Sequence, residues 1–127
     1  MFGLFNDKRL LEQKKMIWQN LFASLDFIKV IEEREETERN FFGQDKVDLN
    51  KRLIEKLKSI HSLSSNAVNN GNHKKSLDKA NLNYIQQDNK ILRDIYDSHI
   101  SGGAMFGSFD DYINPSYGWD VALRDWN

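Results

Sequence analysis

The sequence contains no cysteine and a single proline, Pro115, among its 127 residues. Without cysteine the chain forms no disulfide and offers no thiolate as a metal ligand or nucleophile. Because proline is the main helix breaker, its scarcity permits long uninterrupted helices before residue 115. An alternation of apolar and polar residues over a useful length is also missing, so we expect no β-strand.

Long apolar runs and a strong net charge are absent as well. No apolar stretch approaches the ~20 residues that cross a bilayer. The first residues, MFGLFNDKRLL, are not typical of a secretory signal because charge arrives at Asp7. We therefore expect a cytoplasmic protein of a bacterium, a virus or a host cell. The net charge of −1 gives no overall electrostatic reason to expect nucleic acid.

What the sequence does have is helical periodicity, which is clearest from about residue 7 to about residue 39. One wide apolar stripe runs from Leu10 to Ile28, and a second stripe on the opposite side contains Met16, Phe27 and Val30. A surface helix needs only one apolar face. Two faces indicate either a central helix or a face that a second copy of the chain covers, so Met16, Phe27 and Val30 are the candidate homodimer interface.

Two further helices follow by the same reasoning. Phe41, Phe42 and Gly43 are expected to form a docked turn in which the glycine ends the first helix. The second helix is expected over about 45–63, a loop over 64–73 with a turn at Asn70-Gly71, and the third helix from a cap at Ser76 to about residue 100.

The last 24 residues, 104–127, differ in kind because they combine six aromatic residues with four aspartates. Ser108 and Asp111 have the spacing of a helix cap, and Asn114 before Pro115 predicts the start of a last amphipathic helix over 115–126. The prediction is an all-α fold: a small helical bundle of three long helices within residues 1–103, plus a short C-terminal amphipathic helix in the aromatic, acidic segment 104–127 packed on the same domain. The aromatic and acidic residues of this segment are the candidate partner-binding residues: Phe109, Asp110, Asp111, Tyr112, Tyr117, Trp119 and Trp126.

No motif in the sequence points to catalysis, a metal or a cofactor. His61, His73 and His99 lack the spacing of metal ligands, and the E-x-x-H motif of two-metal bundles does not occur. His73 is expected to be exposed in its polar loop. A nucleophile elbow and a phosphate-binding loop are also missing. We therefore predict no enzyme, no metal and no cofactor.

The remaining hypotheses concern binding. The first is a non-enzymatic protein-interaction module that binds and blocks or bridges another macromolecule, as small inhibitors, immunity proteins and phage accessory proteins do. The alternative is a structural or assembly subunit that acts as a homo-oligomer. The third is a nucleic-acid-binding accessory protein that uses a modest basic surface formed by Lys46, Lys51, Arg52, Lys58, Lys74 and Lys75.

Overall fold

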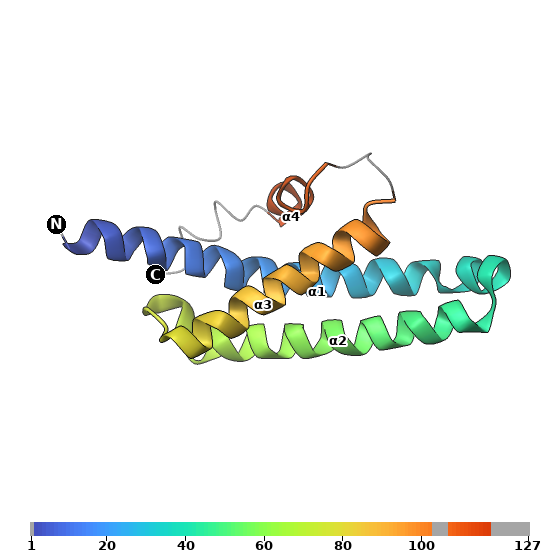
Figure 1. Cartoon of the computed structure of the whole chain (residues 1–127), viewed down its shortest axis with the longest axis horizontal. Coiled ribbons are helices and arrows are strands. Elements are labelled where there is room, and N and C mark those ends of the chain that lie inside the picture. Colours follow the sequence, from blue (N-terminus) through green and yellow to red (C-terminus); the bar gives the residue numbers. More distant parts are fainter. Residues whose placement is uncertain (1, 103–106, 118–127) are drawn as a thin grey trace.

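The computed structural model describes the backbone of residues 2–102 and 107–117, and the side chains of residues 9–102 and 107–113. Every regular element in these ranges is helical, and they contain no strand, which confirms the all-α class (Figure 1). The elements are α1 (Phe2–Phe42), α2 (Gln44–Asn69), a 3-10 helix η1 (Asn72–Lys74), α3 (Lys79–Ile95), its π-helical continuation η2 (Tyr96–Ile100) and α4 (Phe109–Tyr117).

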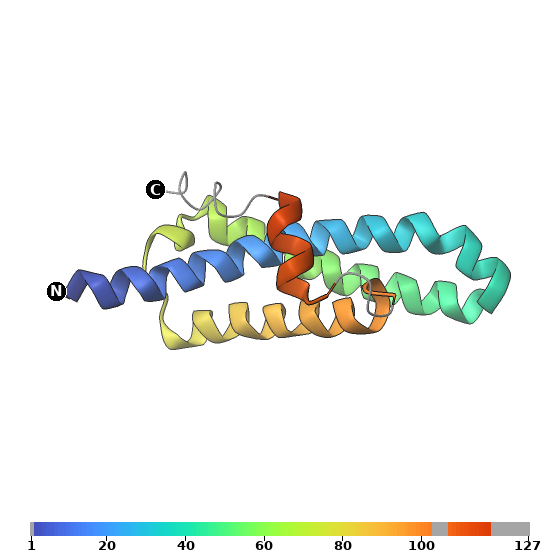
Figure 2. The same ribbon diagram turned by 90° about the horizontal axis from the view of Figure 1, so that it is seen from above.

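Helix α1 is the central element, because α2, α3 and α4 all pack against it. It is about 60 Å long and forms an antiparallel hairpin with α2, while α4 crosses it on the side opposite α2 (Figures 1 and 2). Both apolar faces of α1 are therefore used within a single chain. Of the two explanations for its two stripes, the central position is the one that the fold realises.

The hydrophobic core gathers around the middle of α1. Trp18 and Phe27 of α1, Leu57 of α2, Tyr96 of η2 and Ile113 of α4 are all buried to at least 99%. Complete burial of an apolar side chain contributes about 1.5–3 kcal/mol, so a shared cluster of this kind holds the four helices together.

Phe27 was a candidate for the homodimer interface, and the fold places it in this core with no exposed surface. Its ring lies near those of Tyr96, Phe109 and Tyr112, at centroid distances of 6.2, 6.1 and 6.4 Å. A ring that is covered by its own chain has no area left for a second copy. Met16 and Val30 are half-buried, and their contact with a second copy stays a prediction.

The turn between α1 and α2 differs from its expected form. Gly43 ends α1 as predicted: its φ is +81°, and its N–H donates to the Arg39 carbonyl at 2.9 Å. The predicted docking of this turn is wrong, because Phe41 is 79% exposed and Phe42 is 69% exposed. The α1–α2 hairpin extends beyond the end of α3 (Figures 1 and 2), so no third helix covers these two rings.

The connection between α2 and α3 is shorter than expected. Helix α2 continues to Asn69, so residues 64–69 are helical rather than a loop; the Ser64 hydroxyl donates to the Ile60 carbonyl at 2.8 Å and stays inside the helix. The predicted turn at Gly71 is confirmed by its φ of +73°. Asp78 rather than Ser76 caps α3, since its Oδ1 accepts the Asn81 N–H at 2.8 Å.

The short helix η1 is fixed against α1 by one buried amide, Gln13. Its Nε2 donates to the carbonyls of Asn72 and Lys75 at 2.9 and 2.7 Å, and its Oε1 accepts the Leu77 N–H at 3.1 Å. This anchoring explains why His73 is only 6% exposed, against the expectation of an exposed loop histidine.

Helix α4 begins as the sequence predicts and ends differently. The Ser108 hydroxyl accepts the Asp111 N–H at 3.2 Å, and the Asp111 carboxylate accepts the Ser108 N–H at 3.3 Å, a reciprocal cap. The helix then continues through Pro115 to Tyr117, so a new helix does not start at Pro115. Most of the predicted helix over 115–126, with Trp119 and Trp126, lies outside the described residues.

Candidate functional site

The aromatic face of α4 covers the core of its own chain. Phe109, predicted to bind a partner, is 3% exposed. Its ring meets those of Phe27 and Tyr96 edge-on at 6.1 Å, and the Arg93 guanidinium lies 4.7 Å from its centroid. Phe109 thus packs α4 against α1 and η2.

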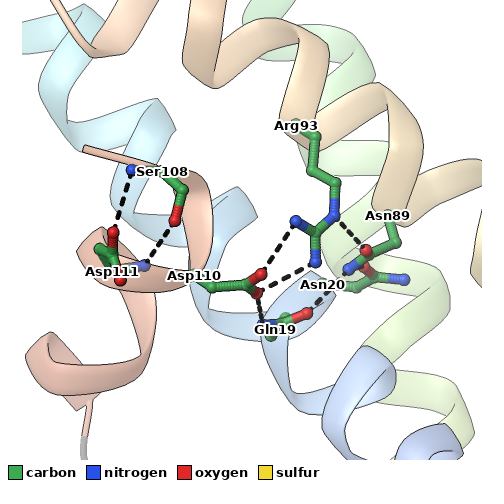
Figure 3. Close-up of polar contacts among 7 residues, drawn as sticks. All are labelled: Gln19, Asn20, Asn89, Arg93, Ser108, Asp110 and Asp111. Atoms are coloured by element: carbon green, nitrogen blue, oxygen red, sulfur yellow. Dashed lines mark hydrogen bonds and ion pairs between the residues drawn. The ribbon is translucent and has the colours of Figure 1, made fainter. Parts of the chain in front are cut away.

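A closed ring of hydrogen bonds fixes the other side of α4 (Figure 3). Arg93 donates to both carboxylate oxygens of Asp110 at 3.2 and 3.0 Å, and Gln19 donates to Asp110 at 2.7 Å. Asn89 closes the ring, since it donates to Gln19 at 3.2 Å and accepts from Arg93 at 2.8 Å. Because Asp110 of α4 accepts from Gln19 of α1 and from Arg93 of α3, the ring specifies how α4 docks on α1 and α3.

The electrostatics of Asp110 agree with a structural role. Burial on its own would raise the pKa of this carboxyl group, but the hydrogen bonds from Arg93 and Gln19 and the positive charges of Arg93 and Lys15 together lower it. The group is held in its charged form with its oxygens occupied. General acid or base catalysis favours a carboxyl group whose pKa lies near the working pH, and the pKa of Asp110 is shifted away from that range.

Two other predicted partner-binding residues, Tyr112 and Asp111, also make contacts within their own chain. The Tyr112 hydroxyl donates to Asp26 at 2.8 Å, while Asp111 is exposed and caps α4. The side chains of Tyr117, Trp119 and Trp126 lie outside the described part of the chain. Within that part, the expected aromatic and acidic surface is mainly an internal packing surface.

The basic residues of the nucleic-acid alternative do not gather in one place. They extend from Lys46 near the start of α2 to Lys74 and Lys75 beyond its end, and Lys51, Arg52 and Lys58 are exposed along the helix. Lys46 forms an ion pair with Glu38 at 3.3 Å. Charges that are spread along a helix in this way are typical of a solvated face.

A groove that the sequence analysis did not identify lies between α2 and α3. Both helices pack against α1, and together with the η1 connection they enclose a cavity of about 350 Å³. The cavity has the size of a small-molecule or side-chain binding site. Its apolar lining, which defines the α2–α3 groove, consists of Ile17, Leu63, Ala67, Leu77, Tyr84 and Ile85.

Exposed apolar side chains and a rim of amides characterise this groove. Leu63 is 54% exposed and Tyr84 is 65% exposed, whereas Ile17 at the base is 1% exposed. The rim carries four amide side chains, which can donate and accept hydrogen bonds: Asn66, Asn70, Asn72 and Asn81. The arrangement offers apolar contact in the interior and polar contact at the edge, as binding sites commonly do.

The sequence held a partial signal for this groove. Leu63 and Tyr84 follow the helical spacing of the apolar faces of their helices, so periodicity alone assigns them to the core. The asparagines within residues 64–73 indicate only a loop by composition, and Asn81 indicates a polar middle of the third helix. Locating the groove requires knowing how α2 and α3 are placed relative to one another on α1 (Figure 1). The periodicity of a single helix does not contain this information.

Comparisons with protein-family models, curated proteins and solved structures found no match to this chain. In the described part of the chain, no cluster of three or more histidine, aspartate or glutamate residues could hold a metal ion. None of the described helices combines the length and the apolarity that crossing a membrane requires.

Proposed function

We propose that this chain is a non-enzymatic protein-interaction module, and that its α2–α3 groove receives an amphipathic helical segment of another protein, which it thereby blocks or bridges. The observation that supports the proposal is the groove itself, with the apolar side chains of Leu63 and Tyr84 left largely exposed at its edges. In this proposal α1, α2 and α3 form a helical bundle in which the groove is the position of a further helix.

The groove suits the mode of recognition in which a helix lies in an apolar channel. An incoming helix would place side chains at i, i+3 or i+4 and i+7 between Leu63 and Tyr84, above the base formed by Ile17. Covering the exposed parts of Leu63 and Tyr84 contributes about 1 kcal/mol each. The amides of the rim then give orientation and specificity.

Affinity capture with groove variants tests this function. The full chain, immobilised, is exposed to a lysate of its source cells in parallel with Leu63→Arg and Tyr84→Arg. Leu25→Arg is the matched control, because Leu25 is 49% exposed on α1 and does not line the groove. We expect one discrete protein to be retained by the wild type and by Leu25→Arg, and to be lost from both groove variants.

Equal retention by all four proteins would contradict the proposal. Since Leu63 and Tyr84 are more than half exposed, their variants should keep the wild-type fold, which circular dichroism checks. A variant that loses both the captured protein and its helical content has unfolded and does not test the groove. A groove variant that keeps its fold and still binds the captured protein contradicts the proposal.

The homo-oligomer remains a second candidate because of one observation, the exposure of Phe41 and Phe42 at the end of the α1–α2 hairpin. Neighbouring exposed aromatic rings are typical of contact surfaces. Light scattering of the wild type and of the double variant Phe41→Ser with Phe42→Ser separates the two functions. The interaction-module proposal predicts a monomer for both, and an oligomer that dissociates in the double variant would favour the assembly subunit.

A further inference from the structure

The α2–α3 groove contains one charged side chain among its lining residues, the carboxylate of Asp88 on α3. Tyr84 and Ile85 precede Asp88 by four and three residues, so all three lie on the same side of the helix. Asp88 is half-buried, and the ring of Tyr84 beside it is 65% exposed. An acidic group therefore faces the same space as the exposed apolar side chains.

Asp88 differs from Asp110, a half-buried aspartate of α4, in what surrounds it. Asp110 has Arg93 and Gln19 as direct partners, whereas no ion pair or hydrogen bond joins Asp88 to any of the described side chains. The nearest influence is that of Lys56, an exposed residue of α2. Burial raises the pKa of Asp88, and the positive charge of Lys56 only partly opposes this effect.

We propose that the groove selects a partner segment in which an aromatic or aliphatic side chain lies next to a lysine or arginine. The apolar side chain enters between Leu63 and Ile85, and the cation pairs with the Asp88 carboxylate at the edge of the Tyr84 ring. This inference rests on the proposed function and states which class of helix the groove accepts: a basic amphipathic one, with the cation three or four residues from the apolar anchor.

Charge complementarity is the physical reason for this choice. A cation that enters the groove supplies the partner that Asp88 lacks, and hydrogen bonds between ionised groups are about twice as strong as neutral ones. The exposed face of Tyr84 adds a favourable contact for the same cation. An acidic or purely apolar segment would instead cover a carboxylate without compensating its charge, which disfavours it.

Small probes test the inference without knowledge of the partner. Two-dimensional NMR spectra of the full chain are recorded during titration with phenethylammonium, with neutral 2-phenylethanol and with phenylacetate. We expect saturable amide shifts at Leu63, Tyr84, Ile85 and Asp88 with phenethylammonium. Phenylethanol should bind about five- to tenfold more weakly, and phenylacetate should leave these amides unchanged.

Substitutions assign the selectivity to one carboxylate. Asp88→Asn should weaken phenethylammonium binding about five- to tenfold and remove the difference from phenylethanol. Lys56→Ala, which removes the competing cation, should strengthen phenethylammonium binding about twofold. The matched control is Asp94→Asn, an exposed aspartate of α3 outside the groove, which should leave the affinity unchanged.

The inference is overturned if phenylacetate shifts the groove amides as much as phenethylammonium does, if Asp88→Asn binds the cation with wild-type affinity, or if no probe shifts these amides. None of these results bears on whether Leu63→Arg and Tyr84→Arg lose a captured protein. The charge selectivity and the proposed function therefore fail independently.

Discussion

Truncation of one ring should release α4 from the rest of the protein. In Phe109→Ala the substitution removes a side chain that is 3% exposed and that meets Phe27, Tyr96 and the Arg93 guanidinium. Replacing a buried phenylalanine by alanine costs about 3–5 kcal/mol, which includes the lost transfer free energy and the cavity left behind. For a domain with a total stability of about 5–15 kcal/mol, this is about a fifth or more of the free energy of unfolding.

Urea unfolding followed by far-ultraviolet circular dichroism measures this cost. We expect the unfolding midpoint to fall, together with a decrease of roughly 10–20 °C in the thermal midpoint. The matched control is Tyr84→Ala, which truncates a ring that is 65% exposed and should change stability by less than about 0.5 kcal/mol. A loss below about 1 kcal/mol in Phe109→Ala would refute the placement of α4 as a core element.

Three further outcomes follow from the charges and the exposed rings. Asp110→Asn should lower the free energy of unfolding by about 1 kcal/mol at pH 7. Because the pKa of Asp110 is lowered in the folded state, the stability difference between wild type and variant is present above about pH 4 and disappears as the pH falls through the folded-state pKa. Urea titrations at two pH values measure this difference. Asp88→Asn should raise the free energy of unfolding instead, because burial raises the pKa of Asp88 in the fold and so disfavours its charge. The increase should be up to about 1 kcal/mol at pH 7 and should vanish in acid, below the unfolded-state pKa. Phe41→Ser with Phe42→Ser should leave the thermal midpoint within about 2 °C of the wild type, since both rings are exposed; a larger decrease in differential scanning calorimetry would mean that this end of the hairpin is packed.

The elements that local chemistry determines were predictable from the sequence. Gly43 ends α1, Asn70-Gly71 forms a turn, and Ser108 with Asp111 caps α4, because each depends on residues a few positions apart. The two apolar stripes of α1 predicted that both of its sides are covered, either within the chain or by a second copy; in the fold, α2, α3 and α4 all pack against α1.

The polar groups inside the fold were not predictable in the same way. Gln13, Gln19 and Asn89 are 4%, 1% and 5% exposed, although their residue types favour the surface. Each is buried because a partner from a distant part of the chain satisfies it, as Asp110 satisfies Gln19 at 2.7 Å. The periodicity of a helix shows which face is polar, but it does not show which polar side chains are hydrogen-bonded to a distant part of the chain.

The candidate site was missed for a related reason. Phe109 and Asp110 are of residue types that are common at interfaces, and on that ground they are candidates for partner binding. In the fold these two residues join α4 to the core. The α2–α3 groove arises from the angle between two helices that both pack on a third. That angle is a property of the three-dimensional arrangement, so neither helix reveals it alone.

The most direct test of the central claim is photo-crosslinking from inside the groove, in the cells that produce the chain. The photoreactive residue p-benzoylphenylalanine replaces Tyr84 in one variant and Leu25, on the exposed side of α1, in the other. The account predicts a discrete adduct with a second protein from position 84, and none from position 25. Equal adducts from both positions, no adduct from position 84, or an adduct with the mass of two copies of this chain would contradict it.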